Sequence, residues 1–468
     1  MKNLVLLALA IPAFAFAQQP PVERPPSPPP VMERAAALRD VALRDDSLAW
    51  DILEGLTTEV GPRLAGTAAE ERARDWAVRK LTELGFSNVH VEPFDMPVWV
   101  RGEERAEIVS PFPQPLMVTA LGNSGATPAR GIEAEVVGFD SVAALEAASD
   151  ESVRGRIVFI THAMAPTQDG SGYGVFGAPR RQGPSIASRK GAAAIVIRSI
   201  GTDYHRTPHT GVQTWAEGVR PIPAGALSLP DAEQMQRILA RGRPVRMRLT
   251  LTPRNIGVRR SGNVVAEVPG SDASAGVILI GGHLDSWDLG TGAFDNAAGV
   301  AITTAAAHRI MQAGRPRRTI RVVLFGAEEP GVFGGTAYFE RHRNDGDVVL
   351  VGESDFGADR VWRSNMSVAE ANRPLAARIA DLLQPLGIVP GRERAGAGAD
   401  LGAWARSGTA AFDLNQDGTR YFDYHHNSDD TLDKVDRAQL RQNVAAWTAV
   451  LAAAAEAPEP IERVPNDP

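Results

Sequence analysis

The sequence contains no cysteine among its 468 residues. This absence excludes disulfide bonds, thiol catalysis, thiolate metal ligands and a lipid-modified cysteine behind a leader peptide. Long basic runs are also missing, and the formal net charge of −7 gives no electrostatic footprint for nucleic acid. Beyond the N-terminal leader no apolar run reaches the length that spans a bilayer. The hydrophobic fraction of 44% indicates neither a disordered chain nor a membrane bundle.

The N-terminus has the pattern of a secretory signal peptide over residues 1–17. Lys2 precedes an apolar run, and Ala15 and Ala17 stand where a signal peptidase cleaves. The pattern predicts export to the periplasm or the outside of the cell. Residues 18–35 are rich in proline and are expected to form an extended linker, because proline cannot join a helix interior or a sheet ladder.

The remaining chain is predicted to form an α/β domain that a smaller unit interrupts. Residues 36–115 and 253–458 alternate between strand and helix patterns, which favours a doubly wound mixed sheet with helices on both faces. Residues 116–252 contain more glycine, proline and arginine, with short strand patterns, and residues 459–468 form a tail. The histidines of the inserted unit, His162, His205 and His209, are interpreted as local structural residues.

Polar residues gather where the predicted strands end. The strand beginning at Val277 is apolar over four residues and leads to His283 and Asp285, and Asp295 precedes the next helix. Ligands of open α/β sheets bind beyond the carboxyl ends of the strands. Asp288 lies in the same loop but is interpreted as an ordinary loop residue. This edge of the sheet is therefore the expected site.

Further strand ends supply acidic residues and a histidine pair. The additional candidates are Glu328, Glu329, Asp355, His425 and His426. Adjacent carboxylates such as Glu328 and Glu329 repel each other unless a cation shares them. Imidazole and carboxylate ligands without sulfur suit zinc, although other divalent ions accept the same ligands.

The number of candidate ligands favours two metal ions. A single catalytic zinc needs three protein ligands, whereas this chain offers five. They are His283, Asp295, Glu329, Asp355 and His426. Glu328 is then free to act as a general base toward a metal-activated water. Asp285 cannot easily reach the same ion as His283 and is expected to support that imidazole instead.

These motifs, in this order, resemble the M28 family of co-catalytic zinc exopeptidases, and within it the plasma glutamate carboxypeptidase (carboxypeptidase Q) branch. The Arg63-Leu64-Ala65-Gly66 loop supports that branch. Two short sequence segments of the inserted unit, starting at Gly155 and at Lys190, resemble a protease-associated (PA) domain.

The resemblance implies a di-zinc exopeptidase of small peptides. Asp295 would bridge the two ions and be followed by a cis peptide bond. His283 and Asp355 would complete one ion site, and Glu329 and His426 the other. Glu328 would deprotonate a water shared by the ions, and the hydroxide would attack the peptide carbonyl. The resemblance also allows a homodimer.

The histidine pair and Asp400 each have two interpretations. His426 is preferred to His425 as the ligand because it precedes Asp430 by four residues, as the family's ligand does; His425 would instead hold the substrate carbonyl or only pack. Asp400 could bind a free substrate amine or cap the helix that follows it. Two alternative functions use the same scaffold: a single-zinc acyl transferase of the glutaminyl cyclase kind, and a receptor-like module without catalysis.

Overall fold

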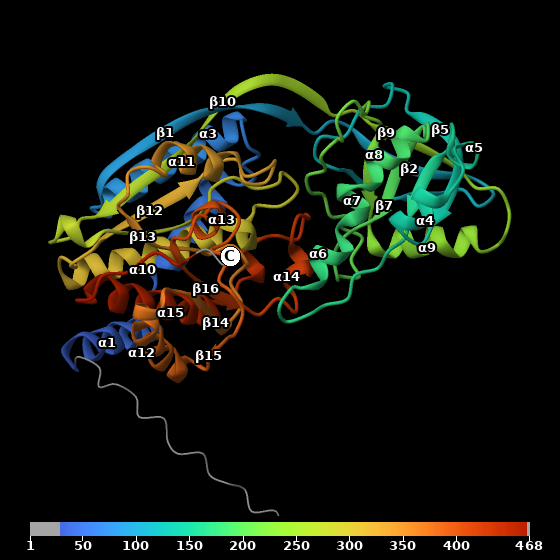
Figure 1. The fold of residues 1–468 in the computed structure, drawn as a ribbon. Coiled ribbons are helices and arrows are strands. Elements are labelled where there is room, and N and C mark those ends of the chain that lie inside the picture. Colours follow the sequence, from blue (N-terminus) through green and yellow to red (C-terminus); the bar gives the residue numbers. More distant parts are fainter. Residues whose placement is uncertain (1–28, 466–468) are drawn as a thin grey trace, which may run out of the picture.

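The structure, a computed structural model, describes residues 29–465 (Figure 1). The predicted signal peptide and residues 18–28 of the predicted linker lie outside this range. Two eight-stranded sheets form two lobes, and a long pair of antiparallel strands connects them (Figure 1). None of the helices between residues 29 and 465 is both long and apolar enough to cross a membrane.

The larger lobe is built on a mixed sheet with a parallel centre. In spatial order its strands are β1 (Ser87–Val100), β10 (Arg254–Val268), β12 (Thr319–Phe325), β11 (Val277–His283), β13 (Val348–Glu353), β16 (Ala410–Gln416), β14 (Val361–Ser367) and β15 (Val389–Pro390). The four strands β12, β11, β13 and β16 run parallel. Their carboxyl ends therefore meet at one edge of the sheet.

Helices cover both faces of this sheet, as the alternation of apolar side chains requires. In β11, Ile278 and Ile280 join one core cluster, whereas Leu279 joins the cluster on the opposite face. The first face carries α1 (Pro29–Asp45), α2 (Leu48–Gly55), α3 (Ala68–Glu83), α10 (Ala298–Ala313), α12 (Arg373–Leu383) and α15 (Arg437–Glu456). The second carries α11 (Phe333–His342) and α13 (Gly402–Arg406). The predicted doubly wound mixed sheet is confirmed.

The smaller lobe is inserted between the paired strands β1 and β10. Its strands, in spatial order, are β3 (Gln114–Leu116), β2 (Glu104–Ser110), β9 (Arg246–Leu251), β5 (Ile132–Phe139), β6 (Ile157–Ile160), β7 (Ala194–Arg198), β8 (Ala224–Leu227) and β4 (Val118–Ala120). The lobe starts at β2, before the boundary predicted at residue 116. Local sequence patterns missed this because β2 pairs with β9, which is far away along the chain.

The proline-rich linker was predicted too long. Helix α1 begins at Pro29, so residues 29–35 are helical and pack toward the core through Ala35. A helix tolerates proline in its first turn because the N–H groups there have no partner within the helix. At the other end, the main-chain oxygen of Glu459 accepts a hydrogen bond from Arg318, so the predicted tail begins against the domain.

Candidate metal centre

Three neighbouring strands bring the predicted residues together. β11 ends at His283, with β12 on one side and β13 on the other. Glu328 and Glu329 follow the end of β12, and Asp355 follows β13 by two residues. Because these strands are parallel, their polar extensions meet at one place beyond the sheet edge.

One half of the centre surrounds the imidazole of His283. Its Nε2 atom lies 3.0 Å from Oδ1 of Asp295 and 3.3 Å from Oδ1 of Asp355. His283 and Asp295 are both buried. Two ligand atoms bound to one tetrahedral zinc at the usual bond lengths are about 3.3 Å apart. The spacing therefore fits the three residues as ligands of one ion.

The other half is formed by Glu329, His426 and the second oxygen of Asp295. Nε2 of His426 lies 3.0 Å from Oε2 of Glu329 and 3.3 Å from Oδ2 of Asp295. Two groups of metal-ligating side chains converge within residues 29–465, namely Asp295, His425 and His426, and His283, Asp295 and Glu329. Asp295 belongs to both groups, so it is the residue whose position suits a bridge.

Unpaired oxygens in this centre call for a cation. Oδ2 of Asp295 and Oε1 of Glu329 are buried without a hydrogen-bond partner. Burial raises the pKa of Glu329 to about 7, and the negative charge of Asp295 acts in the same direction. Buried carboxylates at this density are stabilised by paired charges or metal ions. The donor set, nitrogen and oxygen without sulfur, fits zinc.

The loop that carries Asp295 is held by the main chain. Asp295 sits at a kink within the turn Ala293–Ala297, where its own backbone angles and those of Asn296 are not helical, and the Asp295–Asn296 peptide bond is cis, as the resemblance implies. The carboxylate of Asp430 accepts hydrogen bonds from the main-chain N–H groups of Phe294 and Asp295. Helix α10 starts only at Ala298, two residues later than the sequence pattern indicates.

Asp285 connects two parts of the centre. Its carboxylate accepts hydrogen bonds from the main-chain N–H groups of Glu328 and Glu329, at 3.0 and 3.3 Å. Nδ1 of His283 lies 3.0 Å from the main-chain oxygen of Asp285 and 3.6 Å from its Oδ1 atom. The sequence pattern predicts support of the imidazole, and the contact to the Glu328–Glu329 turn is an additional one.

His425 packs against the ring of His426. The two imidazole rings stack with centres 3.5 Å apart, and Nε2 of His425 is 3.5 Å from Oδ2 of Asp295. Among the described contacts, only His426 of the pair also approaches Glu329. This geometry favours His426 as the ligand.

Asp400 is buried outside the cavity beside the metal centre. Its Oδ1 atom accepts a hydrogen bond from the N–H of Gly335 in α11, and α13, the helix after it, has no side-chain cap. The capping alternative is therefore wrong, because the carboxylate turns to a helix that is distant in sequence. The main-chain N–H of Asp400 donates to Glu353, which lines a neighbouring cavity and which the sequence pattern left without a role.

The cavity beside the metal centre has a volume of about 310 Å³ and is partly lined by the inserted unit. From the larger lobe it is lined by Asp295, Glu328, Glu329, Gly331, Val332, Asp355, Phe356, Tyr421, Phe422, His425 and His426. Tyr173, Arg180 and Val212 of the inserted unit complete it. No local sequence pattern singled out these three residues.

The inserted unit also touches the main chain of the histidine pair. Nδ1 of His209 lies 2.7 Å from the main-chain oxygen of His425, and the N–H of Thr210 donates to that of His426 at 2.9 Å. His209 is buried, and Nδ2 of Asn427 lies 3.2 Å from its Nε2 atom. The interpretation of His209 as a local residue is therefore wrong, because its ring joins the two lobes.

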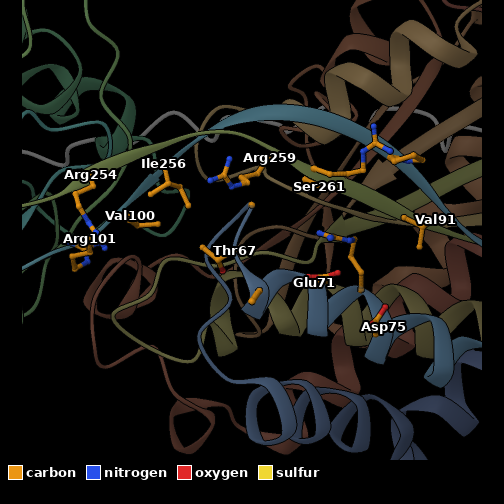
Figure 2. A pocket seen from close by; sticks show the side chains of 15 residues that line it. Thr67, Glu71, Asp75, Val91, Val100, Arg101, Arg254, Ile256, Arg259 and Ser261 are labelled. Atoms are coloured by element: carbon orange, nitrogen blue, oxygen red, sulfur yellow. The ribbon is translucent and has the colours of Figure 1, made fainter.

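Another cavity, of about 900 Å³, lies apart from the metal centre between the paired strands β1 and β10 and helix α3 (Figure 2). Its lining combines arginines such as Arg254 and Arg259 with the acidic Glu71 and Asp75 of α3 (Figure 2). None of the predicted site residues contributes to it. Volume alone therefore does not locate the reactive site in this fold.

Arg63 holds the loops of the metal centre in place. It is fully buried, and its guanidinium donates hydrogen bonds to the main-chain oxygens of Gly61, Leu284, Thr291 and Gly292. Leu284 follows β11, and the last two precede Asp295, so one side chain connects both ligand segments.

Removing this guanidinium should destabilise the fold. We expect Arg63→Met to lower the free energy of unfolding by about 3–5 kcal/mol, because several buried carbonyl groups lose their donor. Urea unfolding measures the change. Arg72→Met is the matched control, since Arg72 is exposed and donates to the main-chain oxygen of Ala68 in its own helix, α3. Equal effects of the two substitutions would contradict this role of Arg63.

Comparison with known proteins identifies the family. The model of peptidase family M28 matches residues 263–451. Carboxypeptidase Q from Bos taurus is 34% identical in sequence, over 88% of this chain and 86% of its own. Carboxypeptidase Q from Homo sapiens is also 34% identical, with 92% of each chain covered.

Solved structures agree with this assignment. A peptidase M28 precursor from Shewanella amazonensis has a TM-score of 0.91 and 44% sequence identity, covering 93% of this chain and 99% of its own. BSAP, a zinc aminopeptidase from Bacillus subtilis, has a TM-score of 0.64 at 17% identity over 88% of this chain and 95% of its own, and it supports the fold alone. The chain therefore belongs to peptidase family M28 and is a zinc metallopeptidase.

Proposed function

We propose that this protein is an exported di-zinc exopeptidase that hydrolyses small peptides. The single observation that carries the proposal is the position of Asp295, whose two carboxylate oxygens face separate partners, His283 on one side and His426 on the other. A single ion would leave one of these sides without a cation. Export rests on the signal-peptide pattern of residues 1–17, and the inserted unit is proposed to be a PA-like domain.

Each ligand has a place in this proposal. His283 and Asp355 would hold one zinc ion, Glu329 and His426 the other, and Asp295 both. When bound, zinc polarises a peptide carbonyl and lowers the pKa of a neighbouring water. The paired ions also favour the ionised form of the buried carboxylates around them.

Glu328 is the residue that moves the proton. It lines the cavity, stands next to a ligand in sequence and makes none of the close contacts within the ligand set. Burial raises the pKa of Glu328 well above its usual range. A carboxylate with a raised pKa accepts a proton from water readily and then passes it to the amine that leaves. Asp285 fixes the main chain of this glutamate by accepting its N–H.

Metal analysis separates this proposal from the single-zinc alternative. We expect about two zinc ions per chain in the purified protein, loss of peptide hydrolysis after chelation, and recovery when zinc is added back. About one ion per chain, together with no hydrolysis of these peptides, would favour the glutaminyl cyclase kind of chemistry. A folded protein that binds no metal would contradict both. Dipeptides and aminoacyl anilides with free and blocked termini serve as substrates.

A further inference from the structure

The inserted unit places a buried cation at the wall of the reactive cavity. Arg180 lies in α7 (Ala178–Arg181) and lines the cavity together with Tyr173 of α6 (Gly172–Phe176) and Val212. We propose that Arg180 binds a carboxylate group of the peptide substrate and so determines which peptides the enzyme selects. This inference rests on the proposed exopeptidase function and adds the substrate class.

Arg180 is buried without an anion. Only 4% of its surface is exposed, and within residues 29–465 no carboxylate pairs with it. Its Nη2 atom donates to the hydroxyl of Tyr173 at 2.5 Å, and Nη1 to the main-chain oxygen of Thr210 at 3.2 Å. Nε is buried and has no partner. Because a buried charge without a counter-charge is costly, this guanidinium at the wall of a cavity indicates an anionic ligand.

The guanidinium lies close to the histidine pair. A Cβ atom built on Gly211 would be 2.0 Å from Nη1 of Arg180 and 2.8 Å from Nδ1 of His426, so both nitrogens border the same small space. Nε2 of His426, on the far side of the ring, faces Glu329 and Asp295. The width of one imidazole therefore separates the cation from the metal centre.

The carboxylates of the metal centre do not satisfy Arg180. In the proposed centre, Asp295, Glu329, Asp355 and the base Glu328 carry four negative charges, which the four positive charges of two zinc ions would balance. The ions thus compensate their own ligands. The anion that Arg180 lacks must then come from a molecule that enters the cavity.

The distance between Arg180 and the metal centre suits a substrate carboxylate that is one residue away from the scissile bond. Consecutive Cα atoms in a peptide are about 3.8 Å apart. When the scissile carbonyl lies at the metal centre, the next residue reaches past His426 toward Arg180. A carboxylate there is either the C-terminus of a dipeptide or the side chain of an acidic residue, and both match the planar fork of arginine.

The experiment compares substrates that differ only in one carboxylate. Ala-Ala and its C-terminal amide test the terminal group, and Ala-Glu-amide with Ala-Gln-amide tests the side chain. In the wild-type enzyme we expect kcat/KM to be about 10- to 100-fold higher for the substrate with the carboxylate, the usual value of a charge-assisted hydrogen bond. In Arg180→Met this ratio should fall toward one, mainly through KM.

Two further variants control for structural effects. Arg180→Lys keeps the charge but loses the fork, and it should retain part of the preference. Arg181→Met removes the neighbouring exposed arginine, which donates to Gly174, and it should leave the preference unchanged. Binding gives a second readout, since free alanine should raise the thermal unfolding temperature of the wild-type zinc-loaded enzyme more than alaninamide does, and Arg180→Met should remove this difference.

The outcomes separate the proposal from a structural role. Loss of the preference for Ala-Ala in Arg180→Met would show that Arg180 binds the terminal carboxylate. Loss of the preference for the glutamate substrate would show that it binds the side-chain carboxylate. An equal loss of activity on every substrate, with the ratio unchanged, would overturn it. If the wild-type enzyme hydrolyses no peptide at all, the proposed function fails, and the unfolding measurements with alanine and alaninamide still decide the role of Arg180.

Discussion

Glu328→Gln is expected to lower kcat for peptide hydrolysis by about 10²- to 10⁴-fold, the usual contribution of a general base. Glutamine keeps the size of the side chain but cannot accept a proton from water. The main-chain N–H of residue 328 can still donate to Asp285, so the turn should keep its shape. Because Glu328 is not among the proposed ligands, the zinc content should stay near two per chain.

Two controls make this result specific. Glu340→Gln removes an exposed carboxylate of α11 that pairs with Arg343, and it should have no effect on turnover. Glu328→Asp keeps the base but withdraws it by one methylene, so its kcat should fall between those of the wild type and the glutamine variant. Wild-type turnover in Glu328→Gln, at unchanged zinc content, would remove Glu328 from the proposed role.

The second large effect concerns the histidine pair. We expect His426→Ala to lose about one zinc ion per chain and to lower kcat by about 10³-fold, since metal ions contribute several kcal/mol of transition-state stabilisation. Its Nε2 atom is the one that lies within 3.3 Å of both Glu329 and Asp295. Metal analysis and steady-state kinetics measure the two effects.

His425→Ala is the matched comparison because the rings are neighbours in sequence and stack on each other. This variant should retain both ions. Its thermal unfolding temperature reports the loss of packing against Tyr173 and Phe422. If His425→Ala loses the ion and His426→Ala keeps it, the two assignments must be exchanged.

Local patterns predicted the sheet that carries the site. The apolar runs of β12 and β13 are short, and acidic residues follow each within three positions, so the strand and its end can both be recognised from a short stretch of sequence. Because the candidate ligands follow the carboxyl ends of these strands, they were expected at one edge of the sheet. The structure gathers all five proposed ligands there, and Glu328 beside them.

Contacts between distant segments could not be predicted in this way. His209 and His425 are separated by 216 residues. The sequence around each of them does not indicate that the ring of His209 contacts the main chain of His425. Arg180 similarly belongs to no recognisable motif. Its proposed role in carboxylate binding follows from the cavity that it lines. Asp400 stands next to a short helix in sequence, yet its carboxylate binds the N–H of Gly335.

The contact of His209 and Thr210 with the histidine pair limits how the two lobes can be exchanged between proteins. A lobe from a relative can replace residues 104–251 only if it brings donors for the main-chain oxygens of His425 and His426, because these otherwise become buried acceptors without a partner. A graft that matched only the connecting strands β1 and β10 would leave the loop of His425 and His426 without these hydrogen bonds. The lobe thus behaves as a fitted part of the peptidase and not as an independent module.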